Sequence, residues 1–283
     1  MKSFLLATIL NHLLLFQTSK AIKTNYGTEL SFTILGDWGG DYQNGHNKST
    51  PFNDASPRGL ALGKAVNAAA DPINGLDTDF IYVNGDNFYE SGVESIESER
   101  WETTFEAIFG EENLQDGQEN FLKDLAIYAQ TGNHDYKGNV SAQIKYSEKQ
   151  DTNWKMPDLW YKIPVTEKMD PLTAFKIEII TIDTDILIAS HSKDQSSKPE
   201  DIYLKISNQY AWIRDQLENA RKNKVDYLIV MGHHPVFSAG GHGNTKELVK
   251  FLLPLFEEYG VQMYICGHDH QLQTIAHTYP QGR

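Results

Sequence analysis

The sequence predicts a single α/β domain in which helices cover a β-sheet structure. Short runs rich in β-branched and aromatic residues, typical of buried strands, alternate with stretches of helical pattern. Such alternation is characteristic of α/β proteins. After residue 21 there is no low-complexity linker, tandem repeat or sharp change in composition, so we expect one domain. The pattern leaves open whether the strands form one sheet or two sheets packed face to face.

Six segments have the composition of buried strands, and four others have helical patterns. The first helix follows Ser56 and Pro57, a favourable start because serine caps free amides and proline fits the first turn. The predicted strands are 30–35, 79–84, 125–130, 175–182, 226–231 and 261–266, and the predicted helices are 58–70, 97–109, 207–222 and 245–258.

The overall composition excludes several classes of protein. The chain has 283 residues, of which 40% are hydrophobic and 22% charged, which excludes disorder, collagen-like repeats and a coiled coil. It carries 25 Lys and Arg against 38 Asp and Glu, a net charge of −13. Nonspecific nucleic-acid binding is therefore not expected, because phosphate backbones are held by clustered basic residues. A local site could still bind a phosphate group.

The N-terminal segment has the pattern of a secretory signal peptide. Lys2 precedes an apolar stretch that ends near Phe16, and Ser19 and Ala21 have the spacing of a cleavage site. The apolar stretch is shorter than the roughly 20 residues that a membrane span needs, and no later segment is apolar enough to span. We therefore expect a signal peptide over 1–21, a mature domain over 22–283, and a secreted or lysosomal protein without stable membrane insertion.

Two further features bear on export. Asn47 and Asn139 each begin an Asn-x-Ser tripeptide, which makes them candidate glycosylation sites, although such tripeptides also occur by chance. Cys266 is the single cysteine, so the chain has no internal disulfide. It lies in an apolar run, where we expect a buried small hydrophobic residue rather than a nucleophile.

Five of the six predicted strands end in glycine followed at once by a residue able to bind a metal. Glycine lets the chain turn sharply and lets the next side chain approach a ligand closely. The carboxyl ends of strands are where α/β proteins bind ligands. One Gly-Asp pair is a common turn, but five such pairs predict a shared site. The residues after the glycines are Asp37, Asp86, Asn133, His233 and His268.

Two neighbouring residues enlarge this candidate metal centre. Tyr89 lies three residues after Asp86, and His270 lies two residues after His268. Two Asp, one Asn, one Tyr and three His exceed the needs of a four-coordinate zinc, and they suit two ions about 3.5–4 Å apart that share a carboxylate. Cysteine takes no part, which disfavours thiolate zinc and iron–sulfur sites.

These motifs resemble a known family. In order they are GDWGG (36–40), GDNFY (85–89), GNHD (132–135), GHHP (232–235) and GHDH (267–270), and they are similar to the five motif blocks of the purple acid phosphatases within the calcineurin-like metallophosphoesterases. The stretch GNVSAQIKYS (138–147) and the His233 to His242 spacing resemble the small, tartrate-resistant acid phosphatases of animals. The resemblance covers about 30–274. It implies a β-sandwich flanked by helices, with a dimetal centre at one edge.

The resemblance also implies how the ligands divide between two ions. Most metallophosphoesterases place a histidine two residues after the first aspartate, and here that position is Gly39, so Tyr89 would supply the missing ligand. A phenolate is a hard anionic donor that favours a trivalent ion. Asp37, Tyr89 and His270 would hold Fe(III), Asn133, His233 and His268 would hold Fe(II) or Zn(II), and Asp86 would bridge both ions.

Other polar residues lie beside these ligands in the sequence. By resemblance, His134 and His242 donate to the substrate phosphate or the leaving group, although His242 could instead be a solvated loop residue. His234 is expected to pack behind the ligands. Asp135 and Asp269 could orient imidazoles as outer acceptors, or they could be solvated turn residues.

The implied activity is hydrolysis of phosphate monoesters, either small molecules or phosphoproteins, by a metal-bound hydroxide. A trivalent ion acidifies bound water strongly, which suits an acid phosphatase. One alternative keeps the fold but makes it a zinc or manganese phosphodiesterase or nucleotide hydrolase. Another is a metal-binding glycoprotein without catalysis.

Three features depart from the family pattern. Only 13 residues follow His270, whereas relatives continue through further strands, so we expect the chain to lack C-terminal strands. The internal disulfide usual in the mammalian relatives cannot form. The polar segment 190–201 resembles in position the exposed loop whose cleavage by a protease activates the animal enzymes, and it could equally be a solvated loop without regulatory role.

Overall fold

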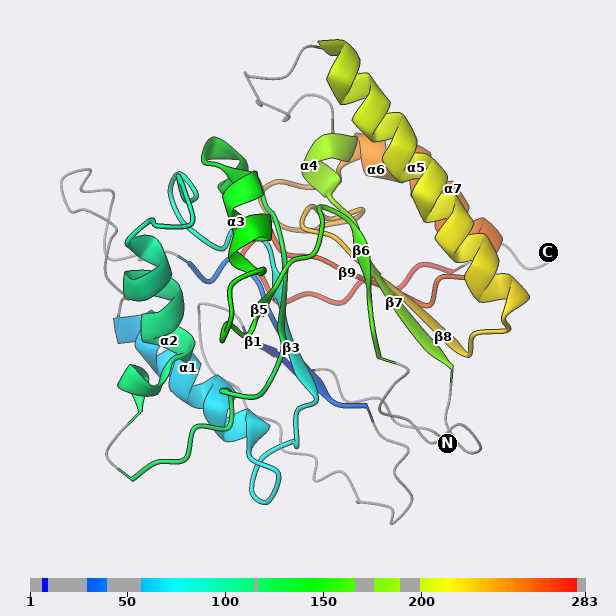
Figure 1. Cartoon of the computed structure of the whole chain (residues 1–283). Helices are drawn as coiled ribbons and strands as arrows, with labels where there is room; N and C mark the ends of the chain where they lie inside the picture. Colours follow the sequence, from blue (N-terminus) through cyan, green and yellow to red (C-terminus); the bar gives the residue numbers. More distant parts are fainter. Residues whose placement is uncertain are drawn as a thin grey trace.

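The computed structural model describes residues 7–9, 30–39, 57–114, 117–165, 176–188 and 199–278, and these form two sheets between two groups of helices (Figure 1). The first sheet has the strand order β1-β2-β3-β4-β5, and all its strands run parallel. Its strands are β1 (Ala7–Ile9), β2 (Phe32–Leu35), β3 (Phe80–Asn84), β4 (Ile127–Gln130) and β5 (Trp154–Lys155).

The second sheet has the strand order β6-β7-β8-β9. The first pair is antiparallel and the other two pairs are parallel. Its strands are β6 (Tyr161–Ile163), β7 (Ile177–Thr181), β8 (Tyr227–Met231) and β9 (Met263–Ile265). The two-sheet alternative is therefore the one that the chain adopts.

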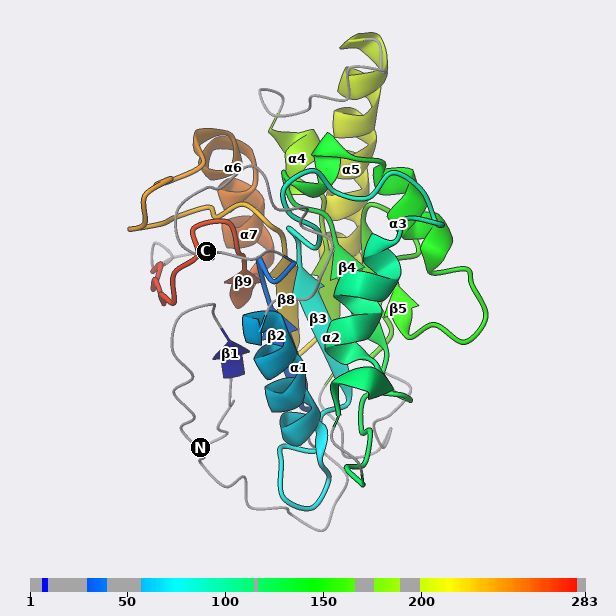
Figure 2. The ribbon, with the colours of Figure 1, turned by 90° about the vertical axis from the view of Figure 1, so that its left-hand side faces the viewer.

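Helices cover the outer face of each sheet (Figures 1 and 2). Beside the first sheet lie α1 (Pro57–Ala70), the π-type turn η1 (Trp101–Glu106), α2 (Ala107–Phe109), the short 3₁₀ turns η2 (Glu111–Asn113) and η3 (Asp135–Lys137), and α3 (Val140–Tyr146). The helices beside the second sheet are α4 (Thr184–Leu187), α5 (Pro199–Lys222), α6 (Lys246–Phe251) and α7 (Leu253–Tyr259).

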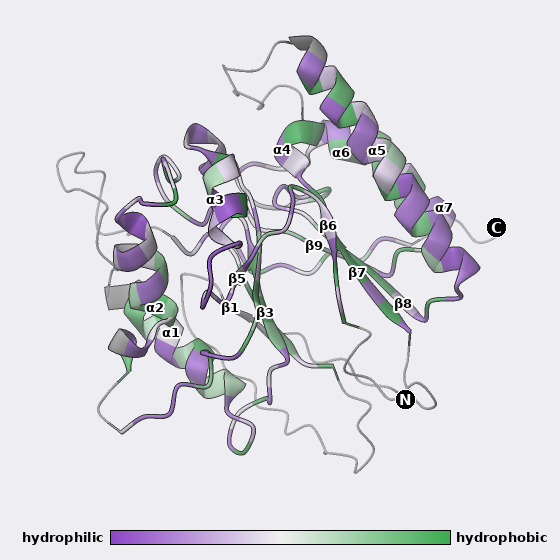
Figure 3. Cartoon of the chain, viewed as in Figure 1, coloured by the Kyte–Doolittle hydropathy of each residue, from purple (hydrophilic) through white to green (hydrophobic). Residues whose placement is uncertain are grey.

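Strand residues alternate between two apolar layers, as their period of two requires. Val83 and Leu35 pack toward the helices of the first sheet, whereas Tyr82 and Ile34 join a cluster shared with Ile229 of β8. That shared cluster contains buried residues of both sheets, so the sheets pack face to face. Figure 3 shows apolar strands at the centre and polar residues on the outer turns of the helices. The predicted β-sandwich flanked by helices is confirmed.

Two predicted helices differ from the observed ones for identifiable reasons. The segment 245–258 is broken at Leu252, where α6 ends and α7 begins. Pro254 in the first turn of α7 has no N–H and would clash with a preceding turn of continuous helix. The helix predicted over 207–222 is longer than expected, because α5 begins at Pro199. The fixed φ of proline suits a first helical turn.

A third predicted helix, 97–109, begins later, at Trp101, whereas the fourth, 58–70, is present as α1. Because α5 begins at residue 199, the end of the predicted loop 190–201 is helical, and 190–198 lie outside the described residues.

The elements that the sequence pattern missed are short. β5 has two residues and β6 has three, too few to display an alternating pattern. β1 lies within the predicted signal peptide and pairs parallel with β2. Cleavage after Ala21 stays a prediction, and a cleaved chain would have β2 at the sheet edge. Over the part of the chain that the structure describes, no helix is both long and apolar enough to cross a membrane.

Candidate metal centre

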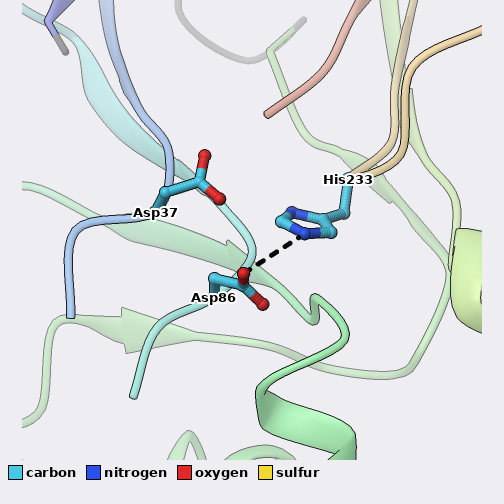
Figure 4. A group of neighbouring side chains, drawn as sticks. All are labelled: Asp37, Asp86 and His233. Atoms are coloured by element: carbon cyan, nitrogen blue, oxygen red, sulfur yellow. Dashed lines mark ion pairs between the residues drawn. The ribbon is translucent and has the colours of Figure 1, made fainter. Parts of the chain in front are cut away.

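The loops after five parallel strands converge at one edge of the sandwich. β2, β3 and β4 of the first sheet and β8 and β9 of the second are each followed within two residues by a predicted glycine and ligand pair. Figure 4 shows Asp37, Asp86 and His233 facing one another from three separate loops. One ligand atom from each lies within 4.8 Å of the others, and all three side chains are buried.

One group of donor atoms surrounds the Tyr89 hydroxyl. It lies 2.9 Å from Asp86 Oδ2, 3.1 Å from Asp37 Oδ1 and 2.9 Å from His270 Nε2. His270 Nε2 is also 3.3 Å from Asp37 Oδ1. Neighbouring ligands of an octahedral ion with bonds of roughly 2.1 Å lie about 3 Å apart. These four ligand atoms carry too few protons to hydrogen-bond to one another in every pair. Their spacing therefore fits a bound cation.

A second group surrounds His233. Its Nε2 lies 3.5 Å from Asp86 Oδ2 and 3.3 Å from Asn133 Oδ1. Its Nδ1 lies 2.9 Å from the Asn84 carbonyl oxygen. Because a carbonyl can only accept, Nδ1 must donate, which leaves the Nε2 lone pair of the neutral ring for a metal. The His268 ring lies 5.2 Å from the His233 ring. Asp86 therefore touches both groups, as a bridging ligand would.

The backbone at these positions is unusual. φ is 56° at Asp37, 51° at Asp86, 74° at His268 and 51° at His270. Residues other than glycine rarely adopt this left-handed region, although Asp and His do so more readily than most. Each such residue costs on the order of 1–3 kcal/mol, and surrounding contacts must hold it there. Four of the seven predicted ligands are thus held in orientations that the local sequence disfavours.

Two glycines are required by close packing at this edge. A Cβ at Gly132 would lie 2.7 Å from His233 Cε1 and would also overlap the Asp86 carboxylate. A Cβ at Gly39 would overlap the Asn87 carbonyl group. No histidine could therefore occupy position 39 in this backbone, and the use of Tyr89 as a ligand stays a prediction.

The charges at the site are strongly coupled. Burial lowers the pKa of His233, but the carboxylates of Asp86, Asp37 and Asp185 together raise it to about 10. Burial raises the pKa of Asp86, yet His233 and His134 bring it below its ordinary value. Burial and the neighbouring His233 lower the pKa of His268 to about 3. The buried carboxylates thus require a positive charge beside them, which either a proton on His233 or a metal cation can supply.

Three further histidines lie around these groups. The His134 ring is 4.3 Å from the Tyr89 ring, and its side chain is 18% exposed. The exposed His242 has its ring 4.3 Å from that of His268. The His234 ring is also 4.3 Å from the His268 ring, and it is buried with Nδ1 2.9 Å from Thr184 Oγ1. The structure thus brings all three to the candidate centre, and their roles stay predictions.

Asp135 and Asp269 differ from both alternatives that the sequence left open. They are 0% and 8% exposed, so neither is a solvated turn residue. Asp135 accepts hydrogen bonds from the backbone N–H groups of Asn87 and Gly132, and Asp269 accepts one from His242 N. These carboxylates therefore fix loop backbones rather than imidazole rings.

The remaining residues singled out in the sequence are the single cysteine and the two candidate glycosylation sites. Cys266 has intermediate exposure, and burial raises the pKa of its thiol to about 12, which does not suit a nucleophile. Asn139 is exposed and its side-chain amide donates to Glu94 O at 3.1 Å. Asn47 lies outside the described residues. Glycosylation at either asparagine stays a prediction.

Residues 30–272 match the family of calcineurin-like phosphoesterases. The chain belongs to this family. The predicted resemblance is thereby confirmed, and its boundaries agree closely with the predicted 30–274.

Named relatives narrow the position of this phosphoesterase within the family. It is 38% identical over 250 residues to tartrate-resistant acid phosphatase type 5 of Homo sapiens, covering 87% of this chain and 68% of the human protein. It is 29% identical over 260 residues to purple acid phosphatase 7 of Arabidopsis thaliana, covering 90% and 68%. The chain is therefore a metallophosphoesterase similar to the purple acid phosphatases.

Among solved structures, this phosphoesterase is similar to GAP50, described as the anchor in the inner membrane complex of Plasmodium. The TM-score is 0.60 at 25% sequence identity, and the match covers 85% of this chain and 66% of that one. The similarity supports the metallophosphoesterase fold.

Asn87 is a residue of this phosphoesterase that sequence reasoning left without a role. It is fully buried, accepts from Trp38 Nε1 at 3.0 Å, and donates to Gln130 O at 2.7 Å and Gln143 Oε1 at 3.1 Å. Asn87 thereby fixes the turn that carries Asp86 and Tyr89. The available signal was its position between two predicted ligands, where a buried amide needs partners.

Proposed function

We propose that this chain is an acid phosphatase that hydrolyses phosphate monoesters at a dinuclear centre of Fe(III) and either Fe(II) or Zn(II). The observation that carries the proposal is the buried Tyr89 hydroxyl, within 3.1 Å of Asp37, Asp86 and His270 atoms. A phenolate among carboxylates is a hard, anionic donor set, which suits a trivalent ion. The acid phosphatase names of the relatives support the same activity.

The two donor groups would divide the ligands. When bound, the ions would supply positive charge for the substrate phosphate and lower the pKa of the attacking water. Asp37, Tyr89 and His270 would hold Fe(III), Asn133, His233 and His268 would hold the divalent ion, and Asp86 would bridge.

His134 is our candidate for the group that protonates the leaving group. Its Nδ1 is 2.8 Å from the Glu90 carbonyl oxygen, and its backbone N–H donates to Asp86 Oδ1 at 2.8 Å. Lys137 Nζ also lies 2.9 Å from this Nδ1, so Nε2 would be the ring atom that gives a proton to the leaving alkoxide. Removal of His134 should therefore slow acid hydrolysis most for substrates with poor leaving groups. His242, exposed beside His268, would contact the substrate phosphate.

The test compares Asp86→Asn with Asp215→Asn, a surface aspartate on α5. Wild type and Asp215→Asn should bind about two metal ions and hydrolyse an aryl phosphate, with aryl phosphodiesters cleaved more slowly. Metal removal should lower their melting temperatures, because bound ions stabilise the folded state. Asp86→Asn should lose the metal, the activity and the metal-dependent part of the melting temperature. An Asp86→Asn protein with full turnover would overturn the assignment, and faster diester cleavage would favour the zinc or manganese phosphodiesterase.

A second candidate is a binding protein without catalysis. The similarity to GAP50, which is described as an anchor, is the observation that favours it. A sample with two bound ions and no turnover of any phosphate ester would support this candidate over the phosphatase.

We further propose that the chain is exported, with cleavage after Ala21, and that the 190–201 segment is the target of an activating protease. The exposed Asn139 is accessible to glycosylation. N-terminal sequencing of the secreted chain tests the cleavage, and the change in its mass on endoglycosidase treatment tests the glycan. Limited proteolysis that cuts within 190–201 without raising activity would overturn the regulatory role.

A further inference from the structure

An open pocket lies between the loop 238–244 and helix α6. Its volume is about 520 Å³, and it is lined by Ser238, Asn244, Lys246, Val249 and Lys250. Lys246, Val249 and Lys250 have i, i+3 and i+4 spacing, so they share one helix face. Figure 2 shows α6 beside α7, on the side where the C-terminal segment also lies. Two lysines therefore line one hollow, and Lys250 Nζ lies 4.8 Å from the centroid of the neighbouring Phe251 ring.

The two lysines of this pocket have no ion-pair partner among the described residues. Glu247 of the same helix acts on Tyr210 of α5, whose pKa is raised by burial and, next, by the Glu247 charge. In a chain of net charge −13, such a pocket is a local site for an anionic group.

The pocket adjoins the candidate metal centre through a single loop. Ser238 N donates to Asn244 Oδ1 at 2.9 Å and so closes the base of the loop. Nearer the tip, His242 N donates to Asp269 Oδ1, and the His242 ring packs on His268. The four-residue step from Ser238 to His242 spans at most about 14 Å. A ligand of moderate length can therefore reach both places.

We propose that this pocket binds an acidic side chain of a phosphorylated peptide whose phosphate lies at the metal centre. The inference rests on the proposed phosphatase function. An extended peptide advances about 3.3 Å per residue, so an acid two to four residues from the phosphorylated one covers the available distance. The Ser238 hydroxyl, which accepts from Gly240 N and Gln273 Nε2, keeps its own proton to donate to a carboxylate.

The experiment compares wild type with the double variant Lys246→Gln/Lys250→Gln. The matched control is Lys222→Gln/Lys224→Gln, which removes two exposed lysines near the distant end of α5. Three substrates are used: an aryl phosphate, a phosphoserine peptide with glutamates three residues on either side, and the same peptide with glutamines. Wild type and the control should show a KM about three- to tenfold lower for the glutamate peptide. The Lys246/Lys250 variant should lose this difference, with kcat and the aryl phosphate KM unchanged.

The outcomes separate this inference from the proposed function. Equal KM values for the two peptides in wild type, or a preference that survives in the Lys246/Lys250 variant, would overturn the pocket assignment while leaving the phosphatase intact. If the metal-loaded protein does not hydrolyse the aryl phosphate, the phosphatase proposal fails. Fluorescence anisotropy with the two labelled phosphopeptides then tests whether the pocket binds an acidic side chain. Equal dissociation constants for the two peptides would overturn the pocket assignment.

Discussion

Asp86 joins the two donor groups of the candidate centre through one carboxylate. Its Oδ2 lies near both Tyr89 OH and His233 Nε2, and its Oδ1 accepts from His134 N. At this scale the sequence predicted the residues that face the centre, because carboxylate, phenol and imidazole ligands follow glycines at strand ends. It did not predict the support from Asn87 or the backbone role of Asp135, because both depend on hydrogen bonds between segments distant in the chain.

Replacement of Asn87 by alanine tests this support. The variant leaves the Trp38 N–H and the Gln130 carbonyl without their buried partner, so we expect a loss of about 2–4 kcal/mol in the free energy of unfolding. The metal content of the folded protein should fall as well. Urea denaturation and metal analysis, with the exposed Asn219→Ala as control, measure both. Unfolding free energies of Asn87→Ala and Asn219→Ala that agree within about 0.5 kcal/mol, as expected of two surface changes, would contradict the supporting role of Asn87.

Asp183 predicts a pH dependence of stability. Burial raises its pKa to about 6 from an ordinary 3.8, although it accepts from Thr131 Oγ1 and Ile186 N. Between these values the folded state binds more protons than the unfolded state, so its contribution to stability is present below about pH 4 and is lost as pH rises through 6. The total is about 3 kcal/mol, at 1.4 kcal/mol per pKa unit.

The matched variant for this prediction is Asp183→Asn, which keeps the shape and does not titrate. The unfolding free energy of wild type minus that of the variant should fall by about 2.4 kcal/mol from pH 4 to pH 7. Urea denaturation at each pH measures it. A difference that is constant with pH would show that Asp183 ionises normally in the folded protein.

At the scale of elements, length decided what the sequence could predict. All six predicted strands are present, because each is a distinct apolar run. The two-residue β5 and three-residue β6 have no readable period, and they form only because neighbouring strands supply hydrogen-bond partners. The break between α6 and α7 was marked by Pro254 but lay within a continuous helical pattern.

Helix α5 predicts contrasting effects of two leucine substitutions. Leu217 is 0% exposed against the second sheet, whereas Leu204 on the same helix is 60% exposed. Leu217→Ala should lower the unfolding free energy by about 2–5 kcal/mol, and Leu204→Ala by less than about 0.5 kcal/mol. Denaturant titration measures both. Equal effects would contradict the packing of this helix.

For the whole molecule, the candidate centre depends on how the two sheets meet. Loops of both sheets carry the ligands, and main-chain bonds such as Gly267 N to His233 O, 2.9 Å, and Asp37 N to Gly85 O, 3.1 Å, connect neighbouring loops. The strand-end pattern predicted a shared site before the architecture was known. The strand pattern alone left the number of sheets open, since buried strands of either arrangement have the same apolar composition, and the β-sandwich was predicted from the family resemblance.

The central claim is that Tyr89 binds a ferric ion, and visible absorption of the purified, metal-loaded protein tests it most directly. Wild type should contain iron and show a broad charge-transfer band, and Tyr89→Phe should lose the band while retaining the fold. The Tyr82→Phe variant, altered at a buried tyrosine within the sandwich, should keep the band. A metal-loaded wild type without the band, or a band that survives in Tyr89→Phe, would contradict the account.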